Sequence, residues 1–159
     1  MTQRVAVLAQ DLIWADRLAR AVEAAGAVPA RAKTAPEFDR ALECADHAIV
    51  DLTARGYDPM VAIERAVAAG AHVLAVGQHD DIDLRKRALA RGADRVLAYR
   101  KLFEDGPATV AAFLARTATR RPACAAACSR RGTTISGASP GPTTSIVSRS
   151  SAIASYPVR

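Results

Sequence analysis

Five short apolar runs alternate with amphipathic segments along residues 1–116, and no other feature of the sequence limits the possible folds as strongly. The runs begin near residues 4, 28, 47, 72 and 95, and they are rich in Val, Ala and Leu, as is typical of strands buried on both faces. The segments between them place apolar residues at helical spacing, as Trp14, Leu18 and Val22 do after the first run. The pattern predicts five strand–helix units in succession.

Residues that favour helix ends mark the borders of the amphipathic segments. Asp11 and Asp58 are placed as N-caps, and residues 34–37 have the spacing of a capping box. Glycines suited to C-caps follow three of the segments: Gly26, Gly70 and Gly92. After the fifth run, the sequence predicts a loop at residues 99–101, a break at residues 106–107 and a last helix that ends near Arg116.

Strict alternation of strands and helices implies a parallel sheet with helices on both faces, joined by right-handed crossovers. Five strands in roughly 115 residues suit a flavodoxin-like, doubly wound α/β fold with the strand order 2-1-3-4-5. In such a sheet, ligands bind outside the carboxyl ends of the strands, near the switch point between the first and third strands. Functional residues are therefore expected in the loops at this edge.

The composition changes near residue 116. Residues 1–116 hold 16 basic and 16 acidic residues and no serine, whereas residues 117–159 hold six arginines, eight serines and no acid. The formal net charge of +6 therefore lies in the last segment, which excludes a uniformly basic nucleic-acid-binding fold. We expect a domain at 1–116 and a disordered tail at 117–159. The tail is interpreted as a basic arm, capable of nonspecific contact with nucleic acid, or as an end foreign to the domain.

No apolar run approaches the roughly 20 residues that a membrane span needs, and no signal peptide precedes the first predicted strand. We therefore expect a cytoplasmic protein with reduced cysteines. Cys124 and Cys128 form a C-x3-C pair without a nearby histidine or further cysteine, and a zinc site usually takes four ligands. No metal site is predicted.

Nucleotide binding is not supported. The loop after the first strand reads AQDLIW and contains no glycine. Neither G-x-G-x-x-G nor G-x-x-x-x-G-K-[ST] occurs, so the backbone cradle for a pyrophosphate is missing. The sequence predicts no cofactor.

Three segments follow a recognisable pattern: IVDLTARGYDP at the end of the third strand, HVLAVGQHDD around the fourth, and GADRVLAY leading into the fifth. With these segments, residues 4–116 resemble the receiver domains of bacterial response regulators. In that family the aspartate that ends the third strand accepts a phosphoryl group, and its position matches Asp51. Two acids that end the first strand hold Mg²⁺, and their positions match Ala9 and Gln10.

Further positions depart from the pattern that the resemblance implies. The Thr or Ser after the fourth strand matches Gly77, which has no hydroxyl, and the Lys after the fifth strand matches Tyr99. Mg²⁺ is usually held by carboxylates, and without it the charge of a transferring phosphoryl group lacks its main neutraliser. The chain therefore resembles a degenerate receiver, or pseudo-receiver.

Two readings of Asp51 stay open: a surviving phosphoacceptor, or an acid that caps the loop after its strand, which we favour. Arg100 or Lys101 is a candidate substitute for the missing lysine, and His79 is interpreted as an exposed loop residue. The pocket at the strand ends is predicted to include Asp11, Thr53, Gly77, His79, Arg100 and Lys101.

These observations favour a non-catalytic, receiver-like module for signalling or protein interaction, independent of phosphorylation, with a protein partner that the sequence does not identify. Two alternatives stay open. One is an atypical response regulator phosphorylated on Asp51, and the other is a small enzyme or ligand-binding α/β domain that uses the same crevice.

Residues 107–115 contain no charged side chain. Val110, Phe113 and Leu114 account for the face of this helix that packs on the sheet. The opposite face carries only alanines: Ala108, Ala111, Ala112 and Ala115. A helix that is apolar all round is usually buried on both sides. We therefore expect a homodimer formed through the fourth helix, the fifth strand and the fifth helix.

Overall fold

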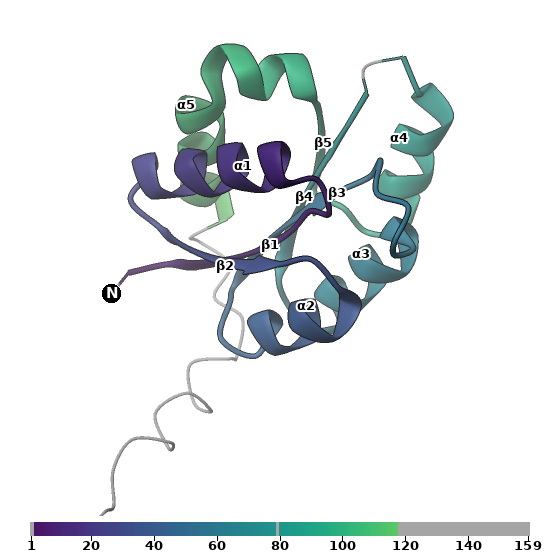
Figure 1. Cartoon of the computed structure of the whole chain (residues 1–159), viewed down its shortest axis with the longest axis horizontal. Helices are drawn as coiled ribbons and strands as arrows, with labels where there is room; N and C mark the ends of the chain where they lie inside the picture. The colour runs from purple at the N-terminus through teal and green to yellow at the C-terminus, as the bar shows by residue number, and fades with distance from the viewer. Residues whose placement is uncertain (1, 79, 118–159) are drawn as a thin grey trace, which may run out of the picture.

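The computed structural model describes residues 2–78 and 80–117, and strands alternate with helices throughout this part of the chain. Figure 1 shows one twisted sheet between two layers of helices. The elements are β1 (Arg4–Leu8), α1 (Leu12–Ala24), β2 (Val28–Ala32), α2 (Ala35–Leu42), β3 (His47–Asp51), α3 (Pro59–Ala68), β4 (His72–Gly77), α4 (Ile82–Ala90), β5 (Arg95–Ala98) and α5 (Tyr99–Thr117).

The five strands are parallel and lie in the order β2-β1-β3-β4-β5, which confirms the flavodoxin-like fold expected from the sequence. Helices α1 and α5 cover one face of the sheet, and α2, α3 and α4 cover the other (Figure 1). Neighbouring residues of β3 point to opposite faces, so that Val50 packs with the α2–α3 side and Ile49 with the α1–α5 side. Every residue of β3 is buried, which explains its continuous apolar run.

Most helices begin at the predicted caps. The carboxylate of Asp11 accepts hydrogen bonds from the backbone N–H groups of Ile13 (2.8 Å) and Trp14 (3.1 Å), and Asp58 caps α3 in the same way. The predicted capping box at residues 34–37 is only half formed. Thr34 makes no side-chain cap, while Glu37 accepts a hydrogen bond from the backbone N–H of Lys33 at 2.8 Å. This bond lowers the pKa of Glu37.

The start of α5 corrects the predicted loop at residues 99–101. The helix begins at Tyr99, immediately after β5, and the predicted break survives as a kink at Asp105 (φ −136°, ψ 40°), two residues before Pro107. Two i, i+4 pairs support these first turns: Arg100 with Glu104 and Lys101 with Asp105, both at 2.8 Å.

None of the helices in residues 2–78 and 80–117 is both long enough and apolar enough to cross a membrane. The predicted tail, with its Cys124–Cys128 pair, lies outside the described residues, so the domain boundary near residue 116 stays a prediction.

A buried imidazole lies at the amino-terminal end of β3. His47 is 3% exposed, and its ring is 5.7 Å from that of His72 and 5.6 Å from that of Phe113, between ring centroids. Burial lowers the pKa of His47, and the charge of His72 lowers it further, whereas Asp46 and Asp94 act in the opposite direction. His47 is therefore favoured as a neutral member of the core.

The depressed pKa of His47 predicts a loss of stability in mild acid. The stability that neutral His47 contributes is complete above the unfolded pKa of about 6.5, and it falls as the pH drops toward the lower pKa of the folded state. In urea unfolding at several pH values, His47→Leu should flatten the dependence below pH about 6.5. His72→Gln, the matched control, should leave most of it in place. An unchanged slope in His47→Leu would contradict this assignment.

Candidate functional site

A hollow of about 490 Å³ opens at the carboxyl ends of β1 and β3, where the sequence placed the site. Residues from the loops after β1 and β3 and from the starts of α1 and α5 line it. Those that matter for the chemistry are Gln10, Asp11, Trp14, Asp51, Thr53 and Tyr99.

Asp51 is the last residue of β3 and is 1% exposed. One of its carboxylate oxygens, Oδ1, accepts hydrogen bonds from the backbone N–H and from the hydroxyl of Thr53, each at 2.9 Å. The same oxygen accepts a hydrogen bond from the hydroxyl of Tyr99. The hydroxyl oxygens of Thr53 and Tyr99 are 2.7 Å apart, so the two residues form one polar cap over the carboxylate.

Tyr99 is held in this place by stacking. Its ring lies against that of Trp14, with the ring centroids 4.0 Å apart and the planes inclined by 29°. Burial raises the pKa of Tyr99, and the hydrogen bond to Asp51 raises it further. The phenol therefore stays protonated at neutral pH and acts as a neutral donor to the carboxylate, where a lysine would bring a positive charge.

Gln10 binds the loop that follows β3. Its side-chain oxygen accepts hydrogen bonds from the backbone N–H groups of Arg55 (3.1 Å) and Gly56 (2.9 Å). A Cβ at Gly56 would lie 2.7 Å from the amide nitrogen of Gln10, so a glycine allows this close approach. The side chain thus fastens two loops together.

Tyr57 adds a second tie at the same end of the sheet. Its hydroxyl lies within hydrogen-bond distance of the carbonyl oxygens of Leu8 (3.1 Å) and Asp51 (2.9 Å), and burial raises its pKa. The ends of β1 and β3 are therefore joined through a side chain as well as through the sheet.

The side chains of the hollow do not fit Mg²⁺, the ion that the resemblance implies. Ala9 is buried, and its side chain has no oxygen that could bind a metal. The side-chain oxygen of Gln10 already accepts hydrogen bonds from two backbone N–H groups. The carboxylate of Asp11 caps α1. Mg²⁺ favours carboxylates, phosphate and water, and Asp51 offers it a carboxylate whose Oδ1 already has three donors. In the part of the chain that the structure describes, no three His, Cys, Asp or Glu side chains gather as metal ligands.

The structure brings together some of the predicted pocket residues. Asp11, Asp51 and Thr53 line the hollow. Gly77 does not: it is buried, and a Cβ there would lie 3.3 Å from the side chain of Leu52. His79 lies outside the described residues.

Arg100 and Lys101 do not line the hollow, because both lie in the first turn of α5 and pair with Glu104 and Asp105 on exposed surface. The sequence analysis missed Trp14 and the capping role of Tyr99. A sequence signal existed: aromatic residues are only 4% of the chain, yet Tyr99 directly follows the fifth predicted strand and Trp14 lies in the first predicted helix, close to its N-cap.

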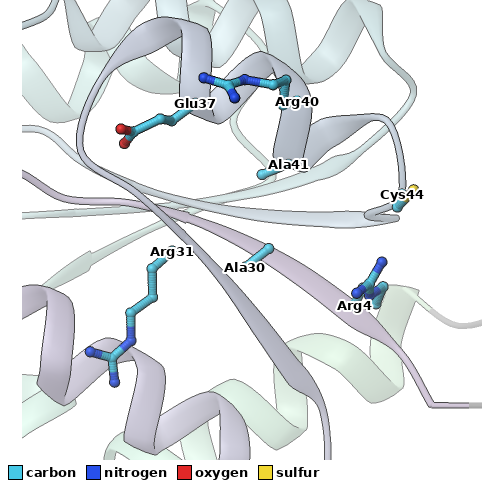
Figure 2. Close-up of a pocket in the computed structure, with 7 residues that line it drawn as sticks. All are labelled: Arg4, Ala30, Arg31, Glu37, Arg40, Ala41 and Cys44. Carbon is cyan, nitrogen blue, oxygen red and sulfur yellow. The ribbon is translucent and has the colours of Figure 1, made fainter.

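Another hollow, of about 340 Å³, lies between β2 and α2 and includes Arg4, Arg31 and Arg40. Figure 2 shows that these arginines do not converge, since Arg31 points away from α2. Arg31 bonds instead to Asp16 on α1 at 3.1 Å, and Arg40 donates to the backbone carbonyl of Pro36 at 3.3 Å. This arrangement is not that of an anion site.

Comparisons with known proteins identify the fold through structure alone. No family model matches the chain, and no curated protein matches it. The signal receiver domain of a putative Luxo repressor protein from Vibrio parahaemolyticus is 16% identical, with a TM-score of 0.64 over 75% of this chain and 95% of that one. A CheY-like receiver domain protein from Methanospirillum hungatei is 19% identical, with a TM-score of 0.62 over 76% and 100% of the two chains.

A response regulator from Burkholderia pseudomallei, solved with a phosphorylated aspartic acid, calcium and citrate, is also similar. It is 20% identical, with a TM-score of 0.56 over 76% of this chain and 75% of that one. At such identities the match establishes a shared fold, and the chain therefore has the fold of a receiver domain.

The hydroxyl of Tyr99 should contribute measurably to stability. Because Tyr99→Phe removes a donor from a buried carboxylate, we expect the free energy of unfolding to fall by roughly 1–3 kcal/mol in urea titrations. In an Asp51→Asn background the same change should cost clearly less, since the acceptor is then uncharged. Equal losses in the two backgrounds would contradict the bond between Tyr99 and Asp51.

Proposed function

We propose that this protein is a receiver-like signalling module that acts through contact with a partner protein, without phosphorylation of Asp51 and without catalysis of its own. The fold supports a signalling module of the receiver type. The proposal that Asp51 is not phosphorylated rests on the three hydrogen bonds that its Oδ1 accepts from Thr53 and Tyr99.

Phosphoryl transfer to a carboxylate needs an accessible oxygen and a cation that neutralises the charge of the transferring group. In the described residues Asp51 is 1% exposed, and the neutral Tyr99 covers it from the α5 side. The side chains that would hold Mg²⁺ are replaced by Ala9 and by the engaged Gln10. Neither the accessible oxygen nor the residues that would hold the cation are found in the described part of the chain, so phosphoryl transfer to Asp51 is not favoured.

An atypical, phosphorylated regulator is the second candidate, and one observation favours it. Arg55 lines the same hollow as Asp51 and brings a positive charge to its rim. An exposed arginine is a weak substitute for a bound divalent ion, because it neutralises less charge and is screened by solvent.

The absence of phosphorylation can be measured directly. We expect incubation with acetyl phosphate and Mg²⁺, followed by intact mass, to give no stoichiometric gain of one phosphoryl group. Thr53→Val and Tyr99→Phe, which remove the two hydroxyl donors to Oδ1 and keep most of the side-chain bulk, test whether these bonds prevent transfer. A gain in the wild type that Asp51→Asn abolishes would establish the second candidate.

We further propose that the exposed alanine face of α5 pairs with a second copy of the chain. Ala108, Ala111, Ala112 and Ala115 are exposed, while Val110, Phe113 and Leu114 on the opposite side are buried. Charges of both signs lie on α4, which contacts β5 as α5 does; among them are Asp83 and Arg87, and they suit a self-complementary polar rim.

Light scattering at tens of micromolar should therefore show a dimer that Ala112→Glu splits, because a carboxylate buried without a partner at an interface costs several kcal/mol. Ala68→Glu, at an exposed position of α3 on the other side of the sheet, is the matched control and should leave the dimer intact. A monomeric wild type would refute the proposal.

A further inference from the structure

A third hollow, of about 320 Å³, lies between α1 and the first half of α5, and we call it the α1–α5 groove. The two helices lie side by side on the same face of the sheet (Figure 1). Its wall is largely apolar and includes Trp14, Leu18, Ala21, Leu102, Phe103 and Pro107. The kink of α5 at Asp105 lies beside this wall.

An aromatic side chain at the groove is left in solvent. Phe103 is 67% exposed, although the residue before it, Leu102, is buried in the core. A single exposed apolar side chain is common on a protein surface, and Phe103 is informative because it continues the apolar wall of the groove.

The charge at the groove has one sign. Arg17 and Arg20 are the ionisable residues that line it, and no acidic side chain does. Arg20 is neutralised by Asp16, with 2.7 Å between their side-chain nitrogen and oxygen atoms. Arg17 instead lies over two rings, its guanidinium carbon 4.7 Å from the centroid of Phe103 and 5.7 Å from that of Trp14.

Within residues 2–78 and 80–117, no carboxylate forms an ion pair with Arg17. Its contacts with Phe103 and Trp14 nevertheless hold the guanidinium at the mouth of the groove. The groove thus presents an apolar, aromatic wall beside a positioned cation with free donors.

From this combination we propose that the α1–α5 groove binds a small aromatic carboxylate. The ring of the ligand packs on the apolar wall of the groove beside Phe103, and its carboxylate accepts hydrogen bonds from Arg17, whose planar fork matches that group. The volume is within the range of roughly 300–1,000 Å³ that small-molecule sites have. Neither the function proposed above nor the state of Asp51 enters this argument.

Trp14 connects this groove with the hollow at Asp51. It lines both, and it stacks on Tyr99, whose hydroxyl caps the carboxylate. A ligand in the groove would therefore be separated from the cap by the stacked rings of Trp14 and Tyr99.

The test uses the full chain and 4-phenylbutyrate as the probe. Trp14 is the single tryptophan of the sequence, so its fluorescence reports on the groove directly. We expect a saturable change with a dissociation constant of about 1 mM or below, as the size of the probe allows. 4-Phenylbutanamide, which has the same ring and chain without the charge, should bind at least about tenfold more weakly.

Two variants test the cation and the aromatic wall of the groove separately. Arg17→Gln should weaken binding of the carboxylate about tenfold or more and leave that of the amide unchanged. Phe103→Ser should weaken both. Arg85→Gln, an exposed arginine on α4, is the matched control and should change neither. Equal binding of acid and amide, or full binding by Arg17→Gln, would overturn the proposal. Absence of saturable binding by the wild type would also overturn it and leave the groove as a contact surface for a protein.

Discussion

The hydrogen bond between Tyr99 and Asp51 is the interaction on which the rest of the candidate site depends. The sheet buries the end of β3, so the carboxylate of Asp51 must find donors within the protein. Thr53 supplies two from the following loop, and Tyr99 supplies one from the start of α5. Donors fixed in this way satisfy the buried carboxylate, and all three bonds end on the same oxygen, Oδ1.

The fold explains why these side chains meet. In a parallel sheet of order β2-β1-β3-β4-β5, the loops after β1 and β3 lie side by side, and the start of α5 lies at the same edge. Asp11 fixes the first turn of α1, which places Trp14 against the ring of Tyr99. The polar cap over Asp51 and the apolar wall of the α1–α5 groove therefore share one aromatic residue, and the two hollows are neighbours for that reason.

Much of this architecture follows from local patterns, and the rest does not. The continuous apolar run of β3 and the aspartates before α1 and α3 predict elements and caps correctly, because each depends on a few adjacent residues. The loop predicted at residues 99–101 was wrong, since these residues form the first turn of α5, whereas the predicted break at residues 106–107 is present as the kink at Asp105. The bonds of Gln10 to residues 55 and 56 join segments that the sequence separates by 45 residues or more, so no local pattern indicates them.

Tyr99 closes the site over Asp51 through the hydrogen bond of its hydroxyl. A crystal structure of the full chain with Mg²⁺ and beryllofluoride, a mimic of the phosphoryl group, tests this closure most directly. We expect the carboxylate of Asp51 to carry no beryllofluoride and the ring of Tyr99 to stay stacked on Trp14, with its hydroxyl on Asp51. Beryllofluoride bound to Asp51, with Tyr99 turned out of the hollow, would contradict it.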